Sequence, residues 1–161
     1  MGHDLEQLAV DLGRCLQSAG HWLSTAESCT GGWIAKCITD VPGSSGWFER
    51  GLVTYSNAAK QELLGVQAAT LTAEGAVSEA VAREMAHGAV ERSHASLALA
   101  VTGIAGPGGG SAAKPVGTVC FGWALPNCLE AETCVFSGDR LQVRRQAAEH
   151  ALRGLLQRCG C

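Results

Sequence analysis

Hydrophobic positions along the chain follow a helical period in some stretches and form short apolar runs in others. Leucines at positions 5, 8, 12 and 16 repeat at helical spacing and predict an amphipathic first helix. The continuous apolar run over 97–101 is typical of a central strand that is buried on both faces. By the same criteria we predict further helices over 33–39, 57–65, 78–92 and from about 140 onward, and further strands over 22–26, 51–56, 116–125 and 131–136.

The order of these segments decides the fold class. The first three strands are separated by helical segments, which favours parallel crossover connections. The last two strands have no helix between them and predict an antiparallel hairpin. We therefore predict an α/β fold, a three-layer α/β/α sandwich with a mixed sheet. The 161 residues, of which 47% are hydrophobic and 17% charged, suffice for one packed domain spanning 1–161.

Net charge and segment lengths restrict the partners of the chain. The formal net charge of −3 argues against general binding to nucleic acid or to an anionic membrane, because those partners favour a basic surface. No apolar run approaches the length of a membrane span, and the first residues lack a basic region followed by an apolar core. We expect a cytoplasmic protein with no nucleic-acid partner and no membrane partner.

Eight cysteines raise the question of a disulfide framework or a metal site. Most of them, such as Cys37 and Cys120, alternate with hydrophobic residues, as buried thiols do in proteins of a reducing compartment. No C-x-x-C pair occurs, and the cysteines at 159 and 161 are isolated from the rest. We interpret the cysteines as structural or incidental thiols, with Cys29 as the exception to test.

One helix carries residues that imitate a metal site. Glu84, His87, Glu91 and His94 fall on one stripe of the predicted helix over 78–92, at the spacing of metal ligands. The stripe lies opposite the apolar face, so we interpret it as a solvated helix surface. We expect no metal and no cofactor.

The octet at 25–32 carries the strongest chemical signal. A predicted strand ends there in small hydroxyl residues and two glycines, and a predicted helix follows. Backbone N–H groups at the start of a helix lack intrahelical partners and point at whatever occupies the turn. Ser28 is therefore a candidate nucleophile whose oxyanion would meet the N–H groups of this turn. The alternative is that Thr30 caps the helix and Ser28 fills a turn. The substrate-binding residues expected in the turn are Cys29, Thr30, Gly31 and Gly32.

Lys60 is the candidate general base. It lies in the first turn of a short helix that we predict to be capped by Asn57, and the helix dipole there pushes a lysine toward its neutral form. Serine with lysine is one of the recognised pairs of nucleophile and base. Tyr55, the only tyrosine of the chain, precedes this turn and is placed to hydrogen-bond the pair or to stack on a ring. The alternative is an exposed lysine without a chemical role.

Three arginines gather at the start of the last predicted helix. Arg140, Arg144 and Arg145 crowd the positive end of the helix dipole, with only Asp139 nearby to offset them. An anion such as phosphate or carboxylate that completes the site accounts for this arrangement. We interpret Arg144 as pointing to solvent and keep Arg140 and Arg145 as substrate-binding candidates.

Three loops follow predicted strand ends, at Ser28, at 55–57 and at 102–111. Ligands of open α/β sheets bind at the carboxyl ends of strands, so we expect the three loops to face one crevice. The loop at 102–111 is rich in glycine but matches neither a Walker A motif nor G-x-G-x-x-G. It contributes Thr102 and Gly103 to the candidate site. Close approach to a ligand and a plain mobile loop are both open readings of its glycines.

Six ordered motifs resemble the CinA C-terminal family. They lie at 25–32, 51–60, 75–78, 101–107, 114–118 and 136–140. Together they extend over nearly the whole chain, and the resemblance is greatest to the stand-alone nicotinamide-nucleotide amidases of that family. It implies an α/β sandwich, usually a homo-oligomer, that converts nicotinamide mononucleotide into nicotinate mononucleotide and ammonia and so returns a pyridine nucleotide to NAD synthesis.

The resemblance also implies roles for individual residues. Ser28 is expected to be the nucleophile and Lys60 its base, with Tyr55, Thr102 and Arg145 in supporting roles. We expect neutral Lys60 to take the Ser28 proton while an arginine from the last helix binds the phosphate. Two alternatives stay open: the thiol of Cys29 as the nucleophile, and a non-catalytic nucleotide-binding or regulatory module, because the family is also linked to competence and DNA damage.

Overall fold

A computed structural model describes residues 4–159 of the chain. The elements in chain order are α1 (Leu5–Ala19), β1 (Leu23–Glu27), α2 (Trp33–Thr39), the 3-10 helix η1 (Ser44–Gly46), β2 (Phe48–Val53), α3 (Asn57–Leu64), α4 (Ala68–Glu74), α5 (Glu79–Glu91), β3 (Leu97–Gly103), β4 (Thr118–Leu125), β5 (Cys128–Val135) and α6 (Arg140–Arg158).

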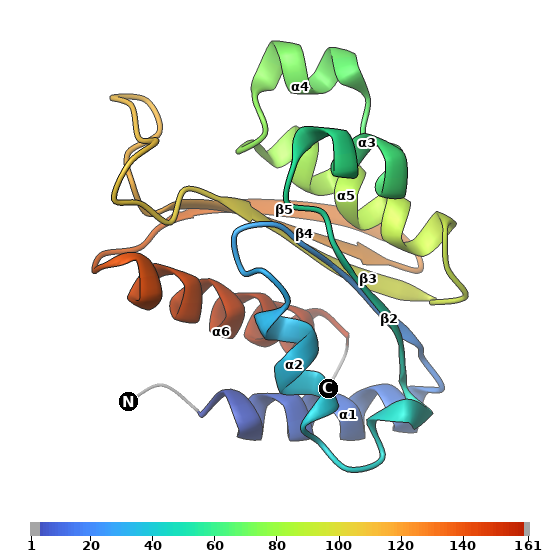
Figure 1. The fold of residues 1–161 in the computed structure, drawn as a ribbon. Coiled ribbons are helices and arrows are strands. Elements are labelled where there is room, and N and C mark those ends of the chain that lie inside the picture. The colour runs from blue at the N-terminus through green and yellow to red at the C-terminus, as the bar shows by residue number, and fades with distance from the viewer. Residues whose placement is uncertain (1–3, 160–161) are drawn as a thin grey trace.

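The strands form one mixed sheet in the order β2-β1-β3-β4-β5 (Figure 1). β1 pairs in parallel with β2 and with β3, whereas β3 with β4 and β4 with β5 are antiparallel. Helices cover both faces: α3, α4 and α5 lie on one side, and α1, α2 and α6 on the other (Figure 1). The predicted three-layer α/β/α sandwich, with its mixed sheet and late hairpin, is confirmed.

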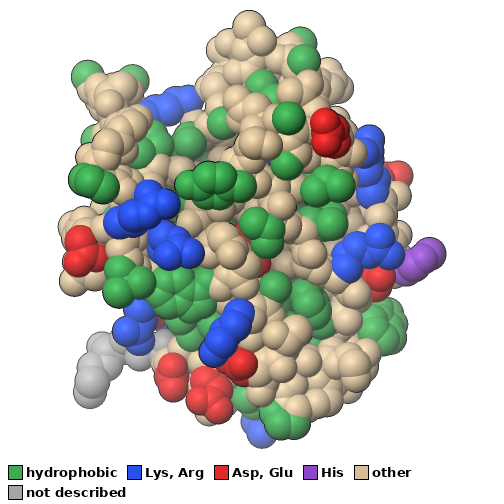
Figure 2. Space-filling model, in the orientation of Figure 1, with side chains coloured by type: hydrophobic (Ala, Val, Ile, Leu, Met, Phe, Trp, Pro, Cys, Tyr) green, Lys and Arg blue, Asp and Glu red, His purple; other side chains and the backbone are tan. Residues whose placement is uncertain are grey.

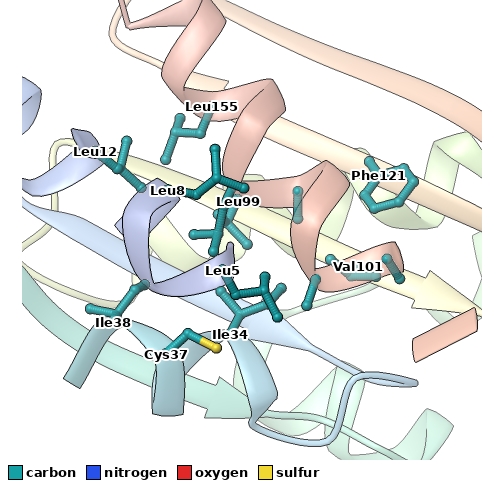
Figure 3. Packing of buried hydrophobic residues seen from close by; sticks show 14 of the residues in the cluster. Leu5, Leu8, Leu12, Ile34, Cys37, Ile38, Leu99, Val101, Phe121 and Leu155 are labelled. Carbon is teal, nitrogen blue, oxygen red and sulfur yellow. The ribbon is translucent and has the colours of Figure 1, made fainter. Parts of the chain in front are cut away.

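The larger core cluster lies between the sheet and the layer of α1, α2 and α6. Figure 3 shows Leu8 and Leu12 of α1 close to Leu155 of α6, with Leu99 of β3 nearby. These four side chains are almost completely buried, so the leucine period of the first helix marks the face that packs. Every residue from 97 to 102 of β3 is buried, as expected for the central strand of a sheet that is covered on both faces.

Side-chain caps determine where α3 and α6 begin. The Ser56 hydroxyl accepts the Ala59 N–H at 3.0 Å and caps α3, so the prediction of a cap at Asn57 is wrong by one residue. At α6, Asp139 and Gln142 form a capping box. These caps set where α3 and α6 begin, and so place Lys60 and Arg140 in the first turns of their helices.

Several elements differ from the sequence prediction. The strands predicted over 116–125 and 131–136 are observed as β4 at Thr118–Leu125 and β5 at Cys128–Val135. The strand predicted over 51–56 is observed as β2 at Phe48–Val53, because Ser56 leaves the sheet to cap α3. The helix α4 is absent from the prediction because none of its residues is buried, so it has no apolar stripe for a period to reveal. In the described part of the chain, no helix combines the length and the apolar character that crossing a membrane requires.

The cysteines follow their prediction in part. Cys29, Cys37 and Cys120 are buried free thiols, as expected from their apolar neighbours. Cys15 is disulfide-bonded, so the prediction of thiols throughout is wrong at this position. Cys161 lies outside the described residues.

Candidate active site

The hydroxyl of Ser28 and the amine of Lys60 are in direct contact. Ser28 follows the last residue of β1, and Lys60 projects from the first turn of α3. The Lys60 Nζ and Ser28 Oγ atoms are 2.9 Å apart, and both side chains are buried. The alternative of an exposed Lys60 is therefore excluded. The fold brings Ser28 and Lys60 together, as predicted from the sequence.

The other contacts of Lys60 fit a neutral amine. Its Nζ also donates to the backbone carbonyl oxygens of Thr54 at 3.0 Å and Tyr55 at 3.2 Å. A neutral amine has two N–H donors and one lone pair, so with both carbonyls satisfied its lone pair can accept the Ser28 hydroxyl proton. Burial lowers the pKa of Lys60, the neighbouring Cys29 sulfur opposes this to a smaller extent, and among the described residues Lys60 forms no ion pair. The site thus favours the form that a general base requires.

The side chain of Glu27, the last residue of β1, caps the start of α2. Its buried carboxylate accepts the backbone N–H groups of Gly32 at 3.2 Å, Ile34 at 3.0 Å and Ala35 at 3.0 Å. A carboxylate at a helix N-terminus is favoured by the dipole, and here it satisfies donors that would otherwise face the turn. The helix end is therefore closed by the protein itself and is not a free anion site.

The turn after Ser28 keeps two donors available. The Gly31 N–H donates to the Ser28 carbonyl oxygen, and the Gly32 N–H to Glu27. Among the described residues, the N–H groups of Cys29 and Thr30 donate to no carbonyl or carboxylate oxygen. The expected set of oxyanion donors at 29–32 thus narrows to these two. Positive φ angles of 59° and 99° at Gly31 and Gly32 let the chain pass from the turn into α2.

Arg144 of α6 hydrogen-bonds to the backbone of this turn. Its Nε donates to the Cys29 carbonyl oxygen at 2.9 Å, and a terminal nitrogen donates to the Thr30 carbonyl oxygen at 3.1 Å. The guanidinium also lies 5.5 Å from the centre of the Trp33 ring. The prediction that Arg144 points to solvent is wrong, because its partners are the carbonyl oxygens of Cys29 and Thr30, the two residues after Ser28.

A cavity of about 260 Å³ opens beside the pair. Seven of its eleven lining residues were predicted as site residues from the sequence. The predicted lining residues are Ser28, Cys29, Tyr55, Lys60, Thr102, Gly103 and Arg140, and the others are Asn57, Ala76, Val77 and Ala105. All three predicted loops reach this cavity, so the expectation of one crevice at the strand ends is confirmed.

Thr102 and Gly103 shape the cavity wall at the end of β3. The Thr102 hydroxyl donates to the Ala76 carbonyl oxygen at 2.9 Å and so ties the strand end to the segment before α5. A Cβ atom on Gly103 would lie 2.8 Å from a Val119 methyl group and 3.1 Å from the Cys29 sulfur. The absence of a side chain at this position is therefore a packing requirement of the site.

Arg140 stands at the mouth of the cavity. It donates to the Gly106 carbonyl oxygen at 2.9 Å, and another of its nitrogens lies 3.5 Å from the Tyr55 hydroxyl oxygen. Tyr55 is 65% exposed, so this edge of the site faces solvent. Figure 2 shows Lys and Arg side chains gathered over the N-terminal end of α6 on this face. The structure does not bring Arg145 here: it is exposed and lines a separate hollow with Ser137, Gly138, Gln142 and Gln146.

Cys29 is a poor nucleophile in this environment. Burial raises the pKa of its thiol to about 12, so the reactive thiolate is not favoured.

The four residues that imitate a metal site do not all lie on α5, because the helix ends at Glu91, before His94. Glu84 accepts the Gln67 N–H at 2.8 Å, and His87, Glu91 and His94 are exposed.

The sequence analysis missed Glu27 and assigned Arg144 wrongly to the solvent. An acidic residue that ends a strand five positions before Gly32 is the signal that could have revealed the carboxylate cap of α2. For Arg144 the sequence carries no such signal, because its carbonyl partners lie 114 and 115 positions away.

Comparisons with known proteins establish the family. Residues 5–159 match the CinA C-terminal domain, and the chain belongs to this family. It is 56% identical to the "Nicotinamide-nucleotide amidohydrolase PncC" of Enterobacter agglomerans, with 95% of this chain and 94% of that protein covered. It is 53% identical to the protein of the same name from Escherichia coli strain K12, with 96% and 94% covered. The crystal structure of "competence/damage inducible protein CihA" from Agrobacterium tumefaciens superposes with a TM-score of 0.93 at 46% identity, covering 96% of this chain and 95% of that one.

Proposed function

We propose that this chain is a nicotinamide-nucleotide amidohydrolase, which hydrolyses the carboxamide of nicotinamide mononucleotide to nicotinate mononucleotide and ammonia. The observation that carries the proposal is the buried contact of 2.9 Å between Lys60 Nζ and Ser28 Oγ at the wall of a cavity. Relatives that are 53–56% identical over nearly the whole chain bear the name of this activity. The sequence identity to these relatives supports nicotinamide mononucleotide as the substrate. The contact between Lys60 and Ser28 supports hydrolysis through an acylated serine.

The first half-reaction acylates Ser28. Neutral Lys60 takes the Ser28 hydroxyl proton while Oγ forms a bond to the carboxamide carbon. The oxyanion that develops accepts the N–H groups of Cys29 and Thr30, and elsewhere the loss of one such donor costs about 3–4 kcal/mol of transition-state stabilisation. The carbon–nitrogen bond then breaks, Lys60 returns the proton to the leaving nitrogen, and ammonia departs.

The second half-reaction restores the enzyme. Lys60, again neutral, takes a proton from water as the water oxygen attacks the acyl carbon. The bond to Ser28 Oγ breaks, the proton returns to the serine oxygen, and nicotinate mononucleotide leaves. The Thr54 and Tyr55 carbonyl oxygens keep the amine in place through both steps, because they bind the two N–H groups that the neutral amine retains.

The mouth of the cavity is suited to the nucleotide end of the substrate. Arg140 brings a guanidinium to the rim, and Tyr55 offers an exposed ring and hydroxyl beside it. In our proposal the pyridine ring enters the cavity while the phosphate stays outside against Arg140. We further propose that the chain works as a cytoplasmic homo-oligomer of single-domain protomers in pyridine-nucleotide salvage and NAD recycling.

The test is an assay for both products with nicotinamide mononucleotide as substrate. We expect equal amounts of ammonia and nicotinate mononucleotide from the purified chain. If the chain binds the mononucleotide and releases neither product, the proposed amidohydrolase activity is overturned. That result would support the alternative of a non-catalytic regulatory module. A Cys29→Ala variant with normal turnover would exclude the thiol as nucleophile, and its complete inactivity in a folded protein would revive that alternative.

A further inference from the structure

Three side chains with metal-ligand chemistry meet far along the chain from Ser28. Glu132 and Cys134 are two positions apart on β5, so they share one face of the strand. His150 approaches that face from α6. The ligand atoms of the three residues lie within 4.8 Å of one another, and each residue is half-buried. None of them lines the cavity beside Ser28.

The spacing of the three groups fits one face of a zinc tetrahedron. The His150 Nε2 atom lies 3.5 Å from the Cys134 sulfur and 3.2 Å from Glu132 Oε2, and the sulfur lies 3.7 Å from Glu132 Oε1. Zinc-to-ligand bonds of about 2.0–2.3 Å at tetrahedral angles place such ligands about 3.4–3.6 Å apart, with the sulfur edges longest. The observed separations follow this order and depart from the range by about 0.2 Å at most, with the two that involve Glu132 ending on different carboxylate oxygens.

The surroundings hold two of the three groups in place. The His150 ring is 4.6 Å from the Phe121 ring and 6.0 Å from the Phe136 ring, centre to centre, which restricts its rotation. The Arg158 guanidinium donates to Glu130 Oε2 at 3.2 Å, lies 3.8 Å from Glu132 Oε2 and is 3.8 Å from the centre of the Trp123 ring. Metal-bound carboxylates are commonly oriented by such an outer partner.

We propose that Glu132, Cys134 and His150 bind one zinc ion, with water as the fourth ligand. A thiolate, an imidazole and a carboxylate form a donor set that zinc accepts, and the anionic groups offset its charge. The site joins β5, one of the two edge strands of the sheet, to the middle of α6, whose first two turns carry Arg140 and Arg144. The site is separate from the cavity of the proposed deamidation.

The test uses the full chain without a histidine tag, freed of metal by a chelator, kept reduced and dialysed against Zn²⁺. We expect one zinc per chain and a higher melting temperature with the metal. Substitution with Co²⁺ should give the charge-transfer absorption of a metal–thiolate bond. In a Cys134→Ser variant we expect the absorption to disappear and zinc affinity to fall by more than the roughly 10–100-fold that loss of an outer partner costs.

A matched control lies on the same strand. Cys128 is an exposed thiol at the start of β5, so a Cys128→Ser variant should keep both the zinc and the cobalt absorption. Failure of the unmodified chain to bind zinc would overturn the proposal. Equal binding by the Cys134→Ser variant, or equal loss in both variants, would also overturn it. Circular dichroism of each variant shows that loss of metal is not loss of fold.

Discussion

The Arg144 Nε atom lies 2.9 Å from the carbonyl oxygen of Cys29 and so holds the peptide unit between Cys29 and Thr30. In a trans peptide the carbonyl and the N–H point in opposite directions, so this contact aims the Thr30 N–H away from Arg144. The guanidinium therefore acts on the turn by orienting a candidate oxyanion donor. In the proposed mechanism it is a positioning residue, and it does not line the cavity itself.

Replacing Arg144 should lower turnover and leave binding nearly unchanged. We expect Arg144→Ala to reduce kcat by about 10- to 100-fold, because a misplaced donor acts on the transition state and not on the bound substrate. Arg144→Lys should rescue little, since one ammonium cannot reproduce the two-pronged contact. Arg153→Ala removes another arginine of α6, one that pairs with Glu149, and serves as the control. A rise in KM alone would contradict this role.

The pH profile should report the state of Lys60. Burial lowers the pKa of Lys60 from its usual 10.5, and only the neutral amine is the base. Activity should therefore rise with pH and level off once Lys60 is deprotonated, at a pH below 10.5. A Lys60→Arg variant should be inactive at every pH, because a guanidinium stays protonated. Measurement of kcat/KM against pH checks this, and activity that falls as pH rises through this range would count against a neutral lysine.

Arg140 and Arg145 should differ in their effect on the phosphate. Arg140 lines the cavity mouth, whereas Arg145 lies in a separate hollow. We expect Arg140→Ala to raise KM for the mononucleotide by about tenfold or more, the loss of one charge-assisted contact, with no such rise for the riboside that lacks the phosphate. Arg145→Ala should raise KM less. The reverse order would assign the phosphate to Arg145, to which the family resemblance gives a supporting role.

Glu27 should matter for stability as well as for the site. Its carboxylate accepts three backbone N–H groups at the start of α2, so Glu27→Gln replaces one acceptor oxygen with a donor that faces other donors. We expect the free energy of unfolding to fall by about 1–3 kcal/mol. Denaturant titration measures this fall, with Glu62→Gln on the exposed surface of α3 as the control. Equal stability of the two variants would contradict the capping role.

Parts of the fold and site that depend on local pattern could be predicted from the sequence. The leucine period of α1 and the apolar run of β3 both mark buried faces, and the pairing of Ser28 with Lys60 follows from loops at strand ends. The helix α4 could not be predicted in this way, because it buries no residue. Arg144 was misjudged for a different reason: an arginine at a helix start looks the same in sequence whether it faces solvent or the carbonyl oxygens of a distant turn.

The release of ammonia by a Ser28→Ala variant tests the central claim most directly. The substitution removes only the hydroxyl oxygen that lies 2.9 Å from Lys60 Nζ, and Ser45→Ala at an exposed position of η1 is the matched control. We predict a loss of at least about 10⁴-fold in kcat for Ser28→Ala, with the fold and the binding of the mononucleotide retained, and no loss for Ser45→Ala. Turnover by Ser28→Ala within tenfold of the unmodified chain would contradict an acylated Ser28.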